Sequence, residues 1–262
     1  MRIDSSTRAL ITGASRGIGR ATARALAARG ARVGLVSRGE KPLAKLVAEI
    51  GERASVHPAD VAERRQIAGA VASFIDEAGG IDLLVANAGI ARYAPFAEQD
   101  PDDVERMIAV NVLGTINTVR AALEEMLDRG SGHIVVISSG AALRAFPWAA
   151  VYGATKAADK GFAEALRHEL SGTGVSLSTI FPGEVATSLH SEAAQLPDWR
   201  NSHDAIPPEI VADKILEAVE RDRREVHVPG QVRLLAINDL APALLDRLLA
   251  AIRGGAAAPR RY

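Results

Sequence analysis

The chain contains no cysteine, and aromatic residues make up only 4% of its 262 positions. Within the chain, the absence of cysteine excludes disulfides, thiolate nucleophiles and cysteine-ligated metals, and it fits a reducing compartment. The six histidines are scattered, without the H-E-x-x-H spacing or another metal-binding spacing. We therefore predict a site chemistry that uses no metal ion.

The chain also has no large excess of charge of either sign and no long apolar run. The 31 basic and 32 acidic residues are spread along the chain and give a net charge of −1, so there is no basic patch for nucleic acid. No run of about 18 uncharged apolar residues is present. The first residues lack the apolar core of a signal peptide. We expect a cytoplasmic protein with no transmembrane segment and no nucleic-acid partner.

Short apolar runs alternate with helical patterns along the chain. This alternation predicts a single-domain α/β fold, a Rossmann-like doubly wound parallel β-sheet with helices on both faces. The candidate strands are residues 7–12, 31–37, 54–58, 81–86, 132–138, 174–181 and 224–228. The candidate helices are residues 17–29, 41–51, 63–78, 102–129, 149–171 and 208–222.

The predicted body, residues 1–230, is followed by a C-terminal extension. Residues 231–253 repeat leucine and isoleucine at helical spacing, and Pro242 divides them into two predicted amphipathic helices. Ordinary core or subunit packing is the favoured role, with contact to a membrane surface or a cover over the substrate mouth as alternatives. Residues 254–262 are small and basic, which predicts a disordered tail.

A glycine-rich turn follows the first predicted strand. Glycines permit a tight turn and a close approach of phosphate to the backbone, and the following helix presents free N–H groups. A plain βα turn is the alternative, but the position at the first strand–helix junction favours a nucleotide site. The candidate residues are Gly13, Ser15, Arg16, Gly17, Ile18 and Gly19.

Tyr152 and Lys156 stand four residues apart in a predicted helix, so they share one face. A neighbouring ammonium favours the phenolate and lowers the pKa of tyrosine from about 10. Such a tyrosine can exchange protons near neutral pH, as the interconversion of a carbonyl and an alcohol requires. Ser139 lies thirteen positions upstream. Alone, such a pair is more often a surface contact, so the prediction depends on the other motifs.

From about Ser6 to Thr187 the chain resembles the short-chain dehydrogenase/reductase family. One departure is Ala86, where many members have a first asparagine before Asn87. The likeness rests on motifs that occur in the family's order and at similar spacing: Thr12–Gly19, Asp60-Val61, Asn87-Ala88-Gly89, Asn111, Ser139, Tyr152 with Lys156, and Pro182-Gly183.

The resemblance implies four catalytic residues. Tyr152 would exchange a proton with the substrate oxygen, Lys156 would lower the tyrosine pKa and hold the nicotinamide ribose, and Ser139 would orient the substrate. Asn111 would help to anchor a water that leads protons to Lys156. Ser139 ending a strand and Asn111 packing inside a helix are the plainer alternatives.

The resemblance also implies a set of cofactor-binding residues. Asp60 would meet the adenine, with a helix cap as a second role. The set comprises the glycine loop, Tyr152, Lys156, Arg38, Asp60, Val61, Asn87, Ala88, Gly89, Pro182, Gly183, Val185 and Thr187.

Two arginines indicate which cofactor is bound. No acidic residue stands at positions 36–38 to accept the ribose 2′-OH of NAD, and Arg38 occupies the place that suits a 2′-phosphate. Arg16 in the glycine loop offers a second cation. Solvated surface arginines are the alternative. We predict that NADP(H) is preferred over NAD(H).

These observations predict an NADP(H)-dependent oxidoreductase acting on a small, mainly apolar ketone, aldehyde or alcohol. An epimerase or dehydratase on the same scaffold, or a non-catalytic nucleotide sensor, is the alternative. Residues 188–208 are expected to form a substrate lid. A homodimer or homotetramer through helices 102–129 and 149–171 is implied by the resemblance. The pocket candidates are Tyr93, Phe146, Trp148, Ala149, Glu184, His190 and Trp199.

Overall fold

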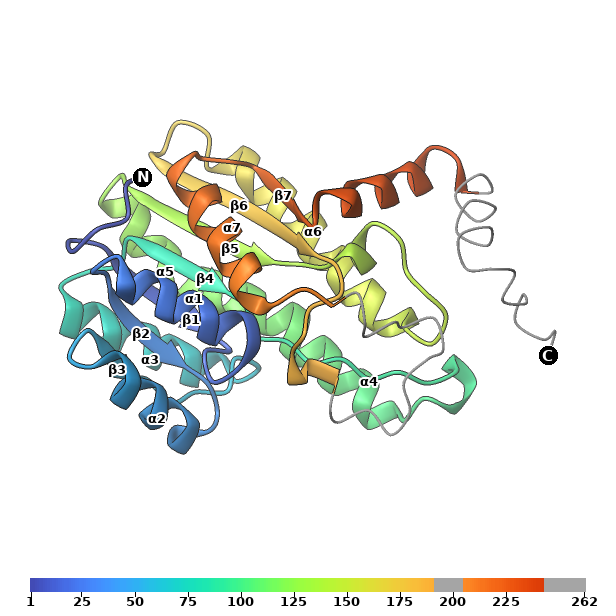
Figure 1. Cartoon of the computed structure of the whole chain (residues 1–262), viewed down its shortest axis with the longest axis horizontal. Helices are drawn as coiled ribbons and strands as arrows, with labels where there is room; N and C mark the ends of the chain where they lie inside the picture. Colours follow the sequence, from blue (N-terminus) through green and yellow to red (C-terminus); the bar gives the residue numbers. More distant parts are fainter. Residues whose placement is uncertain (191–204, 243–262) are drawn as a thin grey trace.

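The computed structural model describes residues 1–190 and 205–242, in which seven parallel strands form one sheet with helices on both faces (Figure 1). The strand order is β3-β2-β1-β4-β5-β6-β7. The predicted fold class is confirmed, and each strand ends within two residues of its predicted limits. The strands are β1 (Arg8–Thr12), β2 (Arg32–Val36), β3 (Ala54–Val56), β4 (Leu83–Ala86), β5 (Gly132–Ile137), β6 (Val175–Pro182) and β7 (Glu225–Val228).

The central strands are apolar on both sides because helices cover both faces of the sheet. On β1, for example, Leu10 packs into one apolar core and Ile11 into the other, and both side chains are fully buried. The helices α1 (Gly17–Ala28), α2 (Glu40–Ile50) and α7 (Pro208–Glu220) contribute to one core. The helices α3 (Arg64–Ala78), α5 (Gly114–Asp128) and α6 (Ala150–Glu169) contribute to the other.

The direction in which strands are added reverses at β1, which pairs with β2 on one side and with β4 on the other. At such a switch point the loops after adjacent strands diverge and leave a crevice at the carboxyl ends of the strands. The topology therefore predicts the position of a ligand site before any side chain is considered.

The predicted helix 102–129 is not continuous. The structure has α4 (Pro101–Met107), a π-helical segment η2 (Ile108–Leu113), and then α5. Within η2 the Asn111 side chain bonds both backbone groups of Ile90, and at Gly114 a Cβ would lie 2.6 Å from Val61 Cγ2. The altered winding thus coincides with close packing against the loops after β3 and β4, and the helical periodicity of the sequence did not reveal it.

The structure also corrects the prediction for the first part of the C-terminal extension. Residues Gly230–Asp239 form a 3-10 helix, η6, instead of an α-helix. Val232 of this segment packs closely on Gly140 and Gly183, where an added Cβ would lie 3.2 and 3.0 Å from its methyl groups. Residues 243–253 of the predicted extension and the predicted tail, 254–262, lie outside the described residues.

The two ends of the predicted lid, residues 188–208, meet beside the sheet. Val185 forms an isolated β-bridge with Ile206, and the amides of Ala186 and Ile206 donate across it. After this bridge the chain continues into a 3-10 turn, η4 (Ser188–His190), and residues 191–204 lie outside the described part. The described residues on the two sides of this segment are therefore joined by the bridge between Val185 and Ile206.

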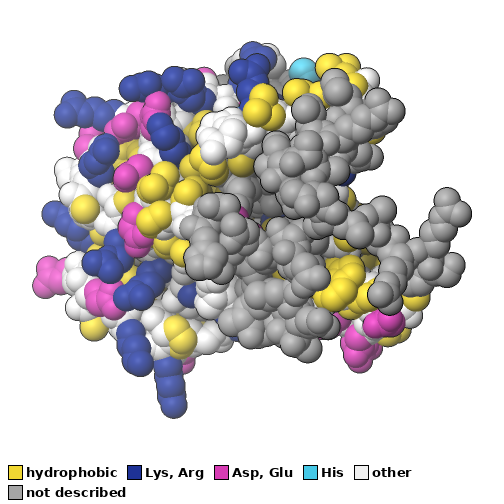
Figure 2. All heavy atoms as spheres, turned by 45° about the vertical axis from the view of Figure 1, so that its right-hand side comes forward, with side chains coloured by type: hydrophobic (Ala, Val, Ile, Leu, Met, Phe, Trp, Pro, Cys, Tyr) yellow, Lys and Arg dark blue, Asp and Glu magenta, His cyan; other side chains and the backbone are white. Residues whose placement is uncertain are grey.

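None of the described helices is both long and apolar enough to cross a bilayer. On the face shown in Figure 2, lysine and arginine side chains alternate with aspartate and glutamate over the left part of the molecule.

Gly34 provides a test of how tightly the sheet and its helices pack. A Cβ at this position would lie 2.5 Å from Phe74 Cδ2 and 2.6 Å from Leu10 Cδ1. Gly34→Ala is expected to lower the free energy of unfolding by about 1–3 kcal/mol, measured by urea denaturation. The matched control is Gly161→Ala on the exposed side of α6, where nothing lies within 4 Å. Gly161→Ala should stabilise the protein by about 0.5–1 kcal/mol. Equal changes in the free energy of unfolding in the two variants would contradict the close packing at Gly34.

Candidate active site

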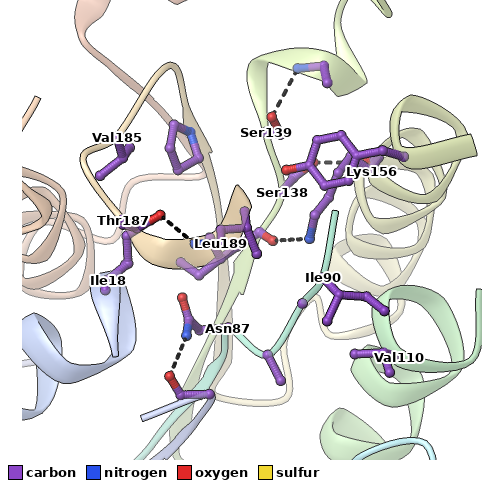
Figure 3. Close-up of a pocket in the computed structure, with 18 of the residues that line it drawn as sticks. Ile18, Asn87, Ile90, Val110, Ser138, Ser139, Lys156, Val185, Thr187 and Leu189 are labelled. Carbon is purple, nitrogen blue, oxygen red and sulfur yellow. Dashed lines mark hydrogen bonds between the residues drawn. The ribbon is translucent and has the colours of Figure 1, made fainter. Parts of the chain in front are cut away.

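A cavity of about 460 Å³ lies at the carboxyl edge of the sheet. Loops that follow β1 to β6 line it, so residues distant in sequence meet at the switch point (Figure 3). In this view Ser139 and Lys156 lie on one wall, and Ile18, Val185 and Thr187 lie across from them. The cavity is large enough for a small-molecule ligand, and its lining includes most of the predicted site residues.

The glycine loop has the geometry of a phosphate cradle. Gly13 and Gly17 adopt φ angles of +67° and +53°, which favour glycine, and a Cβ at Gly17 would lie 2.9 Å from Thr187 Cγ2. Helix α1 begins at Gly17 with no side-chain cap and no acidic residue in its first turn. Its N–H groups and the positive end of its dipole are therefore suited to an anion in the cavity.

Gly19 does not line the cavity, unlike the other predicted residues of this loop. A Cβ there would collide with the Gly13 carbonyl and lie 2.6 Å from the Asn87 side-chain amide. That amide donates to the carbonyls of Thr12 and Gly13 at 2.9 and 3.3 Å. In return, the Thr12 hydroxyl accepts from the backbone of Asn87 and Ala88 at 3.0 and 3.1 Å. These bonds join the glycine loop to the loop after β4, so Gly19 and Asn87 shape the site by packing.

The end of the cavity beside the loops after β1 and β2 carries positive charge from Arg16 and Arg38. Asp60 lies near them and forms an ion pair with Arg106 of α4 at 2.5 Å. Burial acts to raise the pKa of Asp60, but hydrogen bonds from Arg106 and from the backbone of Ala62 outweigh it and hold that pKa below its ordinary value. The expected helix cap is corrected: Asp60 caps a turn at Ala62, because α3 does not begin until Arg64.

Ser139 and Tyr152 line the opposite end of the cavity. The Ser139 hydroxyl accepts a hydrogen bond from the Ala141 amide at 3.1 Å, which fixes the oxygen and leaves its own proton to donate. Tyr152 is buried, and its ring meets that of Tyr93 edge-on with 6.1 Å between centroids. The two predicted side chains, from the turn after β5 and from α6, thus share one wall.

Lys156 is held between β5 and its own helix. Its Nζ donates to the Ile137 carbonyl and to Asp159 Oδ2, both at 2.9 Å. The Ser138 hydroxyl donates to the Lys156 carbonyl at 2.9 Å, so the strand end and the helix are joined twice. Burial acts to lower the pKa of Lys156, but the charges of Asp159 and Tyr152 outweigh it and the pKa is raised. The side chain is therefore an ammonium at neutral pH.

Asn111 lies behind the cavity and does not line it. Its amide nitrogen donates to the Ile90 carbonyl at 2.9 Å and to the Thr155 hydroxyl at 3.0 Å, while its oxygen accepts from the Ile90 amide at 2.8 Å. The Asn111 carbonyl accepts from the Thr115 hydroxyl at 2.7 Å. Asn111 therefore ties η2 to α6 and to the loop after β4, and its expected part in anchoring a water stays a prediction.

The pocket candidates divide into three groups. Tyr93, Phe146, Ala149 and Glu184 line the cavity. Trp148 does not: it has a φ of +67°, and its carbonyl is tied to the amide of Ala94. His190 ends η4, and Trp199 lies outside the described residues.

Sequence reasoning missed several lining residues. Most of them adjoin the motifs and could have been found as their neighbours, but Arg106 and Leu235 come from distant segments with no motif of their own. Leu235 belongs to η6, so part of the C-terminal extension does reach the cavity. The missed residues are Ser37, Ala59, Ile90, Arg106, Val110, Ile137, Ser138, Gly140, Ala141, Leu189 and Leu235.

Comparison with known sequences gives one family. A family model described as short chain dehydrogenase matches residues 7–197. The chain is 34% identical to the ketoacyl reductase HetN of Nostoc sp. over 253 residues, which cover 91% of this chain and 86% of HetN. It is also 36% identical to the glycine betaine reductase ATRR of Emericella nidulans over 239 residues, covering 88% of this chain but only 19% of that much longer protein.

Comparison with solved structures leads to the same family. A short-chain dehydrogenase/reductase from Burkholderia phymatum, in complex with NAD, superposes with a TM-score of 0.85 at 25% identity, covering 94% of this chain and 97% of the other. The closed form of a serine dehydrogenase complexed with NADP+ superposes with a TM-score of 0.79 at 31% identity, covering 84% and 94%.

The fold, the order of motifs around the cavity and these similarities agree with the resemblance found in the sequence. The family model spans well over half of the chain, and relatives above 30% identity extend over most of it. The chain belongs to the short-chain dehydrogenase/reductase family of oxidoreductases.

Proposed function

We propose that this protein is an NADP(H)-dependent oxidoreductase that interconverts a ketone or aldehyde and the corresponding alcohol, with Tyr152 as the general acid and base. The observation that carries the proposal is the composition of one cavity. A serine, a tyrosine and an ammonium share one end, and a glycine loop with two arginines occupies the other. A carbonyl reaction needs the first group, and a phosphorylated dinucleotide suits the second.

The residues present fit such a cofactor. The uncapped N-terminus of α1 and the left-handed Gly13 and Gly17 suit a pyrophosphate, and side chains at these glycines would fill the cradle. Arg38 and Arg16 suit a 2′-phosphate, whereas an acid at 36–38 would repel it. The solved relatives hold NAD in one case and NADP+ in another, so the arginines carry the preference for NADP(H). When bound, the nicotinamide supplies or accepts a hydride.

Within this proposal each side chain has one task. Tyr152 donates its proton to the carbonyl oxygen during reduction and takes it back from the alcohol during oxidation. The Lys156 ammonium stabilises the resulting phenolate. The Ser139 hydroxyl, fixed by the Ala141 amide, donates to the substrate oxygen and orients it. Tyr152 and Lys156 are buried, which strengthens their interaction because little water competes for it.

The substrate end supports a mainly apolar carbonyl compound. Its walls are aromatic or aliphatic, with Glu184 as the charged exception. An apolar pocket with few polar groups selects by shape and by burial of apolar surface. The wall residues are Tyr93, Ala141, Phe146, Ala149, Leu189 and Leu235.

A homo-oligomer is part of the same proposal. Ile108, Leu113 and Leu127 remain 44%, 49% and 40% exposed along η2 and α5. Large apolar side chains that stay exposed along one helix are suited to a subunit contact, which supports a dimer or tetramer through this side.

The cofactor preference is tested by fluorescence titration with NADPH and NADH. We expect NADPH to bind more tightly, and Arg38→Asp to weaken NADPH binding by about 10- to 100-fold through loss of a charged hydrogen bond. Arg32→Asp, at the opposite end of β2, makes the same charge change away from the cavity and should have little effect. Equal binding of the two cofactors, or equal losses in the two variants, would contradict the role of Arg38.

The role of Tyr152 is tested by turnover. Tyr152→Phe should retain NADPH binding and lose carbonyl reduction by at least about 100-fold, because only the proton donor is removed. Reduction of a carbonyl by the unaltered protein would exclude the nucleotide-sensor alternative. Retained turnover in Tyr152→Phe would show that another group carries the proton.

Leu235 tests the apolar pocket. Leu235→Ala removes part of its wall and should raise KM for an apolar ketone about tenfold, with a smaller change in kcat. Leu234→Ala, in the adjacent position of η6 but 59% exposed, is the matched control and should leave both constants unchanged. An unchanged KM in Leu235→Ala would place substrate recognition elsewhere in the cavity.

A further inference from the structure

Asp159 is a buried carboxylate that no motif singled out. Its side chain is 1% exposed and lies one turn after Lys156 on α6, with its Oδ2 2.9 Å from the ammonium. Aspartate is rarely buried unless it is paired. Burying an ion pair costs free energy, and well-packed apolar side chains in its place often give an equally or more stable protein. Its presence beside the lysine of the candidate site therefore calls for a functional explanation.

Three elements hold this carboxylate and its partner in place. Lys156 is shared between Asp159 and the Ile137 carbonyl of β5. From α5, the Thr115 hydroxyl donates to the Asn111 carbonyl at 2.7 Å and acts to lower the pKa of Asp159. The ion pair is thus fixed in the same network that contains Asn111 and the end of β5.

The charges in this network compete for one ammonium. The charge of Asp159 acts on Lys156, and that of Lys156 acts on Asp159, whereas Tyr152 adds a negative charge only as the phenolate. The groups that face them from β5, η2 and α5 are uncharged, namely the Ile137 carbonyl, Asn111 and Thr115. The titratable group that meets the Tyr152 ring is Tyr93, in the loop after β4. Burial raises the pKa of Asp159, although Lys156 opposes this. A positive charge that is already balanced by a carboxylate has less effect on a neighbouring phenol.

We propose that Asp159 is a positioning residue, which fixes the Lys156 ammonium against β5 and offsets part of its charge, so that Tyr152 keeps its proton to a higher pH than it would beside Lys156 alone. The inference rests on the proposed function of Tyr152. The phenol is the form that donates to a carbonyl, and the phenolate is the form that accepts from an alcohol. Asp159 therefore extends the pH range of reduction upward and makes oxidation depend on a more alkaline pH.

The test is the ionisation of Tyr152, followed by the ultraviolet absorbance of the phenolate without any turnover. The chain has three tyrosines, so each titration is taken as a difference from the same protein with Tyr152→Phe. In Asp159→Asn, Tyr152 should ionise about one pH unit lower than in the unaltered protein. Asp159→Glu, which keeps the charge, should restore most of the difference.

The matched control is Glu164→Gln on the same helix. Glu164 is 57% exposed and 3.8 Å from Lys160, so its removal changes the charge of α6 by the same amount at the surface. It should leave the ionisation of Tyr152 unchanged. An unchanged midpoint in Asp159→Asn, or equal shifts in both variants, would overturn the inference.

A second measurement covers the case in which Asp159→Asn fails to fold. Carbon-13 NMR of the Asp159 carboxyl in the unaltered protein, assigned by comparison with Asp159→Glu, should show a carboxylate at neutral pH. A protonated carboxyl there would overturn the inference, because it offsets no charge.

Turnover then separates the two proposals. The alkaline limb of kcat/KM for carbonyl reduction should move down by the same pH interval in Asp159→Asn as the ionisation of Tyr152. A protein that reduces no carbonyl but shows the shift would refute the proposed function and retain the charge coupling. Turnover with an unmoved alkaline limb would refute the role of Asp159 alone.

Discussion

The site depends on how the Lys156 ammonium is held. Its bonds to the Ile137 carbonyl and to Asp159 join the end of β5 to α6, and the Ser138 hydroxyl makes a second link between the same elements. Because Tyr152 lies one turn earlier on α6, fixing the lysine also fixes the wall that carries the tyrosine. A long, flexible side chain thereby becomes a rigid positive charge, as pre-organised electrostatic stabilisation requires.

The parallel sheet supplies the other half of the arrangement. All seven strands run the same way, so the loops that follow β1 to β6 meet at one edge and the switch point opens a crevice between them. At one end of this crevice lies the N-terminus of α1 with Arg16 and Arg38, and at the other lie Ser139 and Tyr152. A dinucleotide that spans the crevice would therefore have its phosphates at the cationic end and its reactive ring near Tyr152, the proposed proton donor.

Much of the fold and of the candidate site could be predicted from the sequence. Each motif directly follows a recognisable strand, and a parallel sheet brings the ends of its strands together at one edge. Features that depend on contacts between distant segments could not. Helical periodicity runs unbroken through η2, whose π-helical winding accompanies the pairing of Asn111 with Ile90 from a distant loop. Apolar spacing in η6 suits an α-helix as well as a 3-10 helix. Arg106 and Asp159 look like ordinary helical charges until the fold places them beside Asp60 and Lys156.

The most direct test of the account is a crystal structure of the protein grown with NADP+. We predict that the 2′-phosphate lies within hydrogen-bonding distance of the Arg38 guanidinium and the pyrophosphate at the N-terminus of α1. The nicotinamide should lie on the side of Tyr152 and Lys156. A cofactor whose 2′-phosphate is in solvent, away from Arg38 and Arg16, would contradict the preference for NADP(H). A nicotinamide lying away from Tyr152 would contradict the assignment of the proton donor.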